Sequence, residues 1–145
     1  MVLKLSYKLS NEKIKYYFSL KRKKNRISEK KIILEGERLV YQVLQTQNYI
    51  DIIILNEENK LSKTRSKILK LAKIKSIPIS TVDINVLNKL SSTKNNQSII
   101  AISNIPCFEI INYKANILAI DRISDPGNLG TLLRSAEWFG INNIL

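Results

Sequence analysis

The sequence ILAIDRISDPGNLGTLLRSAEWFGINNIL, residues 117 to 145, is the segment that indicates the fold class of this chain. It begins with the apolar run Ile117–Ile120, which is typical of a fully buried parallel strand. A turn with proline and glycine follows, and Gly140 then suits the left-handed end of a helix. The segment therefore predicts strand, turn, helix and second strand, with chemistry at the carboxyl end of the first strand.

Each residue of the turn DPGN, residues 125 to 128, suits its position before a helix. Proline presets φ at the second position, glycine accepts a positive φ at the third, and Asn128 caps the helix that follows. The apolar positions expected on that helix are Leu129, Leu132, Leu133, Ala136 and Phe139. An ordinary βα unit also fits this pattern, and in it Asn128 would only cap and Arg134 would only pair with Glu137.

Residues 125 to 140, DPGNLGTLLRSAEWFG, closely resemble the first signature motif of the SpoU/TrmH-type RNA ribose 2′-O-methyltransferases of the SPOUT superfamily. The resemblance is specific because the turn, the asparagine, the arginine six residues later and the aromatic-glycine ending occur in order. It implies a trefoil-knotted parallel-sheet domain, S-adenosylmethionine as cofactor, and Arg134 and Asn128 as catalytic residues. The family builds its cofactor site from two later motifs without a counterpart before Leu145, so we expect an incomplete domain here.

Positive charge is concentrated at the N-terminus. The chain has 24 lysines and arginines against 12 acidic residues, and residues 1 to 31 hold 11 of the basic ones but only Glu12 and Glu29 of the acidic ones. Periodicity predicts one helix from Asn11 to about Lys24 that ends in this basic cluster. Tyr16, Tyr17 and Phe18 are expected in its packed core.

Five side chains of the cluster are interpreted as contacts to an RNA phosphate backbone: Lys21, Arg22, Lys23, Lys24 and Arg26. The alternative is a solvated helix end, where cations are favoured by the helix dipole.

Residues 31 to 45 and 51 to 56 predict strand, helix and strand, joined as a βαβ crossover. The helix is expected to bury four side chains: Leu39, Val40, Val43 and Leu44. The phrase IILEGERLV, residues 32 to 40, resembles the opening of the small, ribosomal-protein-like RNA-binding domain of the same methyltransferase family. That resemblance implies RNA contacts at Glu35, Gly36 and Arg38, although a glycine there also suits the turn alone.

The remaining pattern predicts a helix at residues 59–75 with its lysines facing water, a strand at 77–82, a helix at 84–90 capped by Asp83, a polar loop at 91–97 and a strand at 98–103. Pro78 places its strand at a sheet edge or at a strand start.

The predicted chain is therefore α/β, with a basic leader at residues 1–30, a small α/β RNA-binding domain at 31–104, a linker at 105–116 and the incomplete SPOUT domain at 117–145. The single Cys107 excludes an internal disulfide, and with no histidine present we expect a reducing compartment and no metal. No signal peptide or membrane-spanning run is found, so we expect a cytoplasmic protein without a membrane partner.

The function expected from the resemblance is RNA ribose 2′-O-methylation, on ribosomal rather than transfer RNA, by a protein that is a homodimer when complete. Arg134, always protonated, would hold a phosphate beside the target ribose and stabilise the alkoxide. One alternative is a non-catalytic RNA-binding module, which would not need Arg134 and Asn128. The other is a nucleotide-binding domain, which lacks the GxxxxGK[ST] and GxGxxG patterns.

Overall fold

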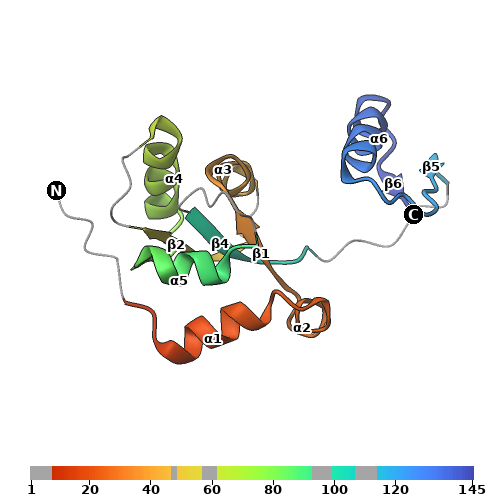
Figure 1. The fold of residues 1–145 in the computed structure, drawn as a ribbon. Coiled ribbons are helices and arrows are strands. Elements are labelled where there is room, and N and C mark those ends of the chain that lie inside the picture. The colour runs from red at the N-terminus through yellow and green to blue at the C-terminus, as the bar shows by residue number, and fades with distance from the viewer. Residues whose placement is uncertain (1–7, 47–48, 57–61, 93–98, 107–113) are drawn as a thin grey trace. The chain divides into compact units, whose positions relative to one another are not determined.

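The computed structural model of the chain describes residues 8–46, 49–56, 62–92, 99–106 and 114–145. It consists of two compact units, Met1–Pro106 and Cys107–Leu145, each of which is described by itself (Figure 1). Five of the expectations from sequence fall partly outside the described residues: residues 1–7 of the leader, the start of the helix at 59, most of the loop at 91–97, the start of the strand at 98 and the middle of the linker, including Cys107.

The described part of the first unit alternates helices and strands. Its helices are α1 (Asn11–Ser19), α2 (Lys23–Glu29), α3 (Glu37–Gln45), α4 (Lys63–Ile74) and α5 (Ile84–Leu90). Its strands are β1 (Lys31–Glu35), β2 (Ile50–Asn56), β3 (Ile79–Val82) and β4 (Ile99–Asn104), which form one sheet in the order β1-β4-β2-β3. The α/β class predicted from the sequence is confirmed.

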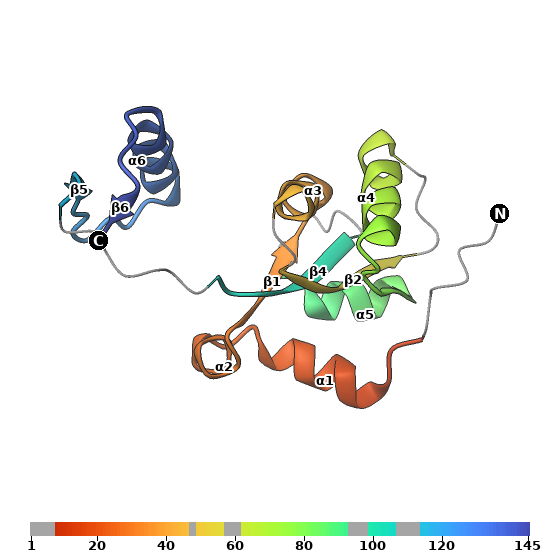
Figure 2. The same cartoon turned by 180° about the vertical axis from the view of Figure 1, so that it is seen from behind.

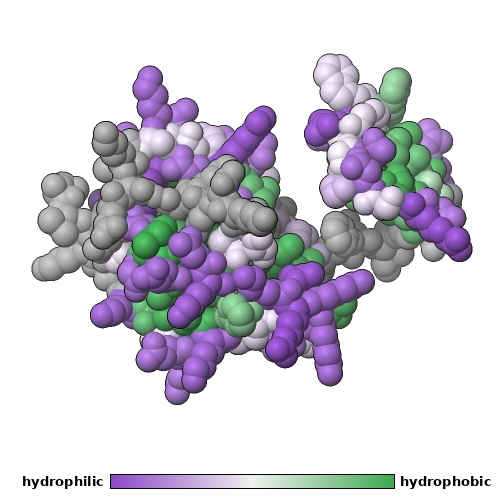
Figure 3. Space-filling model, viewed as in Figure 1, coloured by the Kyte–Doolittle hydropathy of each residue, from purple (hydrophilic) through white to green (hydrophobic). Residues whose placement is uncertain are grey.

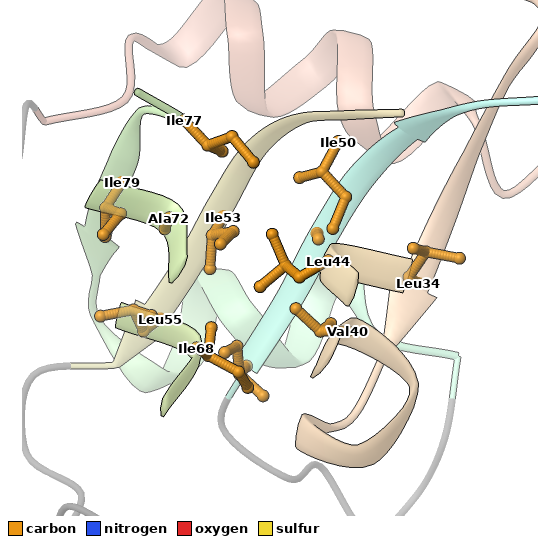
Figure 4. Close-up of a cluster of buried hydrophobic side chains, with 12 residues drawn as sticks. Leu34, Val40, Leu44, Ile50, Ile53, Leu55, Ile68, Ala72, Ile77 and Ile79 are labelled. Carbon is orange, nitrogen blue, oxygen red and sulfur yellow. The ribbon is translucent and has the colours of Figure 1, made fainter. Parts of the chain in front are cut away.

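Helices cover both faces of this sheet (Figures 1 and 2). α3 and α4 enclose one core cluster with residues such as Val40, Leu44 and Ile68, and Figure 4 shows these side chains between the helices and the strands. On the other face, α1 and α5 enclose a second cluster that includes Leu20 and Leu87. The first unit is therefore a three-layer sandwich, and its two faces present different helices to solvent.

The strand β4 is buried on both faces. Ile99 and Ala101 belong to the cluster under α3 and α4, whereas Ile100 and Ile102 belong to the cluster under α1 and α5. This alternation follows from the period of two along a strand. A continuous apolar run such as IIAI is thus the signature of a central strand.

The predicted βαβ crossover is correct in direction but wrong in pairing. β1 and β2 each pair antiparallel with β4, so they run in the same direction while β4 lies between them. β2 pairs parallel with β3 instead. Local periodicity does not encode strand order, and the two strands with four-residue apolar runs, β2 and β4, take the inner places because they need cover on both faces.

The single helix predicted from Asn11 to Lys24 is wrong, because α1 ends at Ser19 and α2 starts at Lys23. The basic cluster itself ends α1: Nδ2 of Asn25 donates to the carbonyl of Ser19 at 3.0 Å. Nη1 of Arg26 donates to the carbonyls of Leu20 and Lys21 at 3.2 and 2.8 Å. These side chains satisfy carbonyls that the end of a helix leaves without partners.

Other expectations for the first unit are mostly confirmed. Asp83 caps α5, and Pro78 directly precedes β3, which is an edge strand. Val40 and Leu44 are buried as predicted, but Leu39 is 42% exposed because the buried stripe of α3 is narrower than expected. The start of α4 was predicted too early, because Ser62 is its extended N-cap and the helix begins at Lys63 rather than at residue 59.

The described part of the second unit holds β5 (Ile117–Leu118), α6 (Pro126–Trp138) and β6 (Asn143–Ile144), with β5 parallel to β6. The predicted strand–helix–strand order is confirmed. The fully buried strand predicted at Ile117–Ile120 is wrong, since β5 has two residues and Ile117 is 37% exposed. Gly140 has a φ of 68° and ends α6 as predicted.

No helix in the described parts of the chain is both long and apolar enough to cross a membrane.

Candidate nucleic-acid interface and signature motif

The start of α6 is held by Asp125, not by Asn128. The carboxylate of Asp125 accepts the backbone N–H of Asn128 at 2.7 Å. Gly127 lies inside the helix without a positive φ, which corrects the predicted turn geometry. A Cβ on Gly127 would lie 3.0 Å from the capping oxygen of Asp125, so glycine here leaves room for the cap. Capping therefore no longer accounts for the side chain of Asn128.

The polar residues of the motif follow one another every three positions along α6. Asn128, Thr131 and Arg134 therefore lie along one side of the helix, and all three are exposed. Oγ1 of Thr131 donates to the carbonyl of Gly127 at 2.9 Å and accepts from Nη2 of Arg134 at 3.3 Å. Thr131 thus orients the guanidinium toward the start of the helix, where Asn128 lies.

Arg134 makes no ion pair with Glu137. The ion pairs among the described residues join Lys31 to Asp51 and Arg122 to Asp121. The alternative role of Arg134 as a partner of Glu137 is therefore wrong. Apart from the Nη2 bond to Thr131, its donors are exposed, as a phosphate contact requires.

The basic elbow, which we define as residues 21 to 26, comprises the connection between α1 and α2 and the first turn of α2. Nζ of Lys21 donates to the carbonyls of Lys89 and Ser91 at 3.0 and 2.6 Å. Lys21 therefore ties the elbow to the end of α5 and Arg26 closes it on the end of α1, whereas Arg22, Lys23 and Lys24 are exposed. Figure 3 shows hydrophilic side chains projecting from the edge of the first unit where α1 and α2 lie. The structure thus divides the five predicted RNA contacts into two structural and three accessible cations.

The aromatic residues before the elbow have different roles. Tyr17 is buried as predicted, but Phe18 is 51% exposed, so its predicted core position is wrong. The hydroxyl of Tyr16 donates to Glu29 at 3.0 Å and ties α1 to α2. Burial, together with the hydrogen bond and charge of Glu29, raises the pKa of Tyr16 from 10.0 to about 12.

The turn between β1 and α3 brings together the other predicted RNA contacts. Gly36 is buried with a φ of 93°, so the turn itself requires glycine. The carboxylate of Glu35 accepts from the hydroxyl of Ser91 at 2.6 Å and from the N–H of Ser92 at 2.8 Å. Glu35 therefore ties β1 to the end of α5, and Arg38, exposed in the first turn of α3, is the accessible group here.

Sequence reasoning missed two residues of this region. Tyr41 lies one turn after Arg38, and Nζ of Lys67 on α4 stands 5.8 Å from the centre of its ring. Arg65 is only 3% exposed, and its Nη2 donates to the carbonyl of Asn56 at 2.6 Å. Burial lowers the pKa of Arg65 against the opposing effect of the charge on Glu37. Tyr41 could have been found from the sequence, because it follows Arg38 at the i, i+3 spacing of one helix face. The burial of Arg65 had no sequence signal.

S-adenosylmethionine does not fit the hollows that the described residues line between α3 and α4. Their cationic side chains include Arg38, Lys67 and Lys70, which would repel the sulfonium. No group of three histidine, cysteine, aspartate or glutamate side chains suited to a metal ion occurs within the described ranges.

A protein-family model described as the MRM3-like substrate binding domain matches residues 11–101, which is more than half of the chain. The chain belongs to this family. The match of the MRM3-like substrate-binding domain starts at Asn11 and so includes α1, the basic elbow and α2.

Two curated relatives of the MRM3-like chain are rRNA methyltransferases by name. The 23S rRNA (guanosine(2553)-2'-O)-methyltransferase RlmP of Bacillus subtilis (strain 168) is 26% identical over 93% of this chain and 51% of its own length. The mitochondrial rRNA methyltransferase 3 of Xenopus tropicalis is 28% identical over 86% of this chain and 31% of its own length. The chain thus spans about half the length of the first relative, and less of the second.

Solved structures agree with this assignment. A TrmH-family structure from Porphyromonas gingivalis matches with a TM-score of 0.68 and 25% identity, covering 95% of this chain and 52% of its own. The AdoMet-bound rRNA methyltransferase from Sinorhizobium meliloti matches with a TM-score of 0.68 and 23% identity, covering 94% of this chain and 51% of its own. The resemblance to SpoU/TrmH proteins found in the sequence is confirmed.

Proposed function

We propose that the MRM3-like chain is the RNA-binding part of an S-adenosylmethionine-dependent ribosomal RNA ribose 2′-O-methyltransferase, joined to the first motif of its catalytic domain. The observation that carries this is the order of features: a substrate-binding domain match over residues 11–101, then a motif with an exposed Arg134. In this proposal residues 1–30 are the basic leader, 31–104 the small domain, 105–116 the linker and 117–145 the start of the SPOUT domain.

Arg134 is the residue we assign to the reacting part of the RNA. Its guanidinium stays protonated, so it cannot serve as the base that removes the 2′-hydroxyl proton. It grips the phosphate next to the target ribose through two donors and stabilises the negative charge that develops on the 2′-oxygen. The hydrogen bond to Thr131 supports this role because it orients the guanidinium before RNA binds.

Asn128 is assigned to orient the RNA or Arg134. Its amide is exposed on the same side of α6, and Asp125 already supplies the helix cap. Asn128→Ser should therefore lower methyl transfer by the complete protein while the helix content of the chain stays unchanged. If Asn128→Ser lost helix content in proportion to its activity, the role of Asn128 would be structural.

The RNA contacts of the first unit are assigned to its accessible cations. Arg22, Lys23 and Lys24 on the elbow and Arg38 on α3 are exposed and suited to phosphate. Lys21, Arg26, Glu35 and Gly36 act by shaping these surfaces, through the bonds and the turn described above. Such contacts place the RNA without reading its sequence.

S-adenosylmethionine supplies the methyl group in this proposal, and residues outside this stretch bind it. We further propose that the complete protein is a cytoplasmic homodimer, as SpoU/TrmH family members commonly are dimers. Sedimentation of the complete protein measures the dimer directly, and a monomer at all concentrations would contradict it.

The proposed function is tested by incubating the complete protein with methyl-labelled S-adenosylmethionine and either protein-free large-subunit ribosomal RNA or transfer RNA. Label should enter a ribose of ribosomal RNA. Arg134→Lys should lower the rate of methyl transfer by about 100-fold, because the ammonium of lysine keeps the positive charge but cannot present two parallel N–H donors to one phosphate. Arg122→Lys is the matched control, since Arg122 is 92% exposed in the same unit and should leave the rate unchanged.

Two results would contradict the proposal. Unchanged transfer by Arg134→Lys would remove Arg134 from the reaction. RNA binding without any methyl transfer would favour the non-catalytic RNA-binding module instead.

A further inference from the structure

We propose that the groove between α3 and α4 is a second RNA-binding surface of the first unit, one that holds the sugar-phosphate backbone. This inference rests on the proposed RNA-binding function; the groove is a different surface from the elbow, and it extends the single contact already assigned to Arg38 across to α4. We call it the basic groove and define it by Arg38, Tyr41, Gln45, Lys67, Lys70 and Lys75.

The basic groove consists of two adjoining hollows of about 510 and 480 Å³. They share Tyr41 and Gln45, so they form one continuous depression along α3. α3 and α4 are both anchored on the sheet by buried residues such as Leu44 and Ile68 (Figure 4). The two walls of the groove are therefore supported by the core beneath them.

The charge of the groove suits a polyanion. Lys67 and Lys70 on α4 and Arg38 on α3 are exposed. Nζ of Lys75 donates to the carbonyl of Thr46 at 2.7 Å, which holds this fourth cation at the end of the groove. Among the described lining residues the one carboxylate is that of Glu37, which accepts from the hydroxyl of Ser62. Phosphates of RNA can therefore line up with cations on both walls.

The uncharged lining of the groove favours RNA over other anions. Tyr41 offers an aromatic ring beside Lys67, and rings of this kind stack on bases or contact sugars. The amide of Gln45 can donate to and accept from hydroxyl groups, including the 2′-hydroxyl that distinguishes RNA. A purely electrostatic surface would not need these groups.

The position of the groove has a consequence for the length of RNA that binds. α3 and α4 lie on one face of the sheet and α1 on the other, so the groove and the elbow face different sides of the first unit (Figures 1 and 2). A short RNA can occupy only one of the two surfaces. A long or folded RNA can reach both and should bind more tightly.

The experiment measures fluorescence anisotropy of the chain with two labelled RNAs, a short oligoribonucleotide and a structured transcript several times longer. Lys67→Glu and Lys70→Glu, singly and together, are compared with Lys73→Glu, which is exposed on the same helix but does not line the groove. The double variant should bind the long transcript about 10-fold more weakly, and each reversal should lower the salt slope by about 1. Lys73→Glu should have less than about a 2-fold effect. Circular dichroism checks that all variants fold.

The elbow variant Lys23→Glu/Lys24→Glu distinguishes failure of the RNA-binding function from failure of the groove proposal. Failure of the unaltered chain to bind either RNA would overturn both the RNA-binding function and the groove. If the elbow variant binds RNA more weakly while the groove variants bind as tightly as Lys73→Glu, the proposed role of the groove is wrong and the RNA-binding function stands. Additive losses from the two sets, seen on the long transcript and not on the short one, would support both surfaces.

Discussion

The two units of the chain obtain their structure in different ways. The first unit buries both faces of a sheet, and side chains such as Ile53 and Ile102 have no exposed surface. In residues 114–145 of the second unit, Ala136 is the one buried side chain, while Trp138 and Phe139 are 90% and 83% exposed. Within this stretch of chain, the first unit is therefore held by a buried core, whereas the described contacts of the second unit are mainly backbone hydrogen bonds at the ends of its elements.

The contacts at the end of α6 are local, whereas those that join β6 to β5 link residues far apart in the sequence. The N–H of Ile141 donates to the carbonyl of Ala136 at 2.8 Å, and the N–H of Gly140 to that of Glu137 at 3.0 Å, which is a Schellman motif. β6 is held to β5 by bonds such as that from Leu145 to Leu118, at 3.0 Å. Substitutions should therefore act through burial in the first unit and through backbone geometry in the second.

The strongest test of this comparison is a pair of core-type truncations. Ile53→Ala should reduce the free energy of unfolding by about 3 kcal/mol, because it leaves a cavity in a fully buried site. Leu132→Ala, at a side chain that is 39% exposed, should cost less than about 1 kcal/mol. Chemical denaturation measures both, and equal losses would break the distinction between the units.

A smaller effect is expected from the carboxylate that joins β1 to the end of α5. Glu35→Ala removes the acceptor for Ser91 and Ser92 and should cost about 2 kcal/mol in unfolding free energy. Glu137→Ala, at an exposed carboxylate of the second unit, is the control and should change stability by less than about 0.5 kcal/mol. A negligible effect of Glu35→Ala would make a direct RNA contact the better explanation of Glu35.

Backbone effects should dominate in the second unit. Gly140→Ala should destabilise α6 by about 1 kcal/mol, since alanine is strained at a φ of 68°. Gly130→Ala should instead stabilise it by up to about 1 kcal/mol, because helical alanine is favoured and its Cβ would meet only Nη1 of Arg134, at 3.8 Å. Thermal melts of helix content check the opposite signs, and equal signs would contradict the proposed geometry.

The smallest effect concerns the pKa of Tyr16, raised to about 12 in the folded chain. The folded state favours the neutral phenol, so this contribution to stability is complete below pH ~10, declines toward pH 12 and is lost above it. The absorbance difference between the unaltered chain and Tyr16→Phe, followed against pH, measures the titration. A midpoint near 10 would mean that neither the burial of Tyr16 nor its contact with Glu29 is formed in solution.

The sequence predicted the elements well where they depend on local pattern and poorly where they depend on neighbours. Asp83 as a cap, Pro78 before an edge strand and Gly140 as a helix end are local, and all three are confirmed. Strand order was not predictable, because β4 takes its central place through contacts with β1 and β2 that are far away in the sequence.

For the candidate site the same distinction holds. The motif placed Arg134 and Asn128 on one helix, but it did not reveal that Asp125 supplies the cap. The distribution of charge identified the basic cluster, but it did not predict the break between α1 and α2 or separate Lys21 and Arg26, whose donors bind backbone carbonyls, from the exposed cations around them. Which polar atoms a tertiary structure engages is decided by residues such as Lys89 and Ser91, about 70 positions away.

The central place of β4 also bears on when the first unit can form as the chain is synthesised. β1 is an edge strand whose neighbour in the sheet is β4, and β4 begins at Ile99. While the ribosome is still adding the preceding residues, β1 has no strand to pair with and β2 lacks one of its two neighbours. The sheet therefore closes late, in a single long-range step, and the apolar strands β1 and β2 must remain soluble until the last strand emerges.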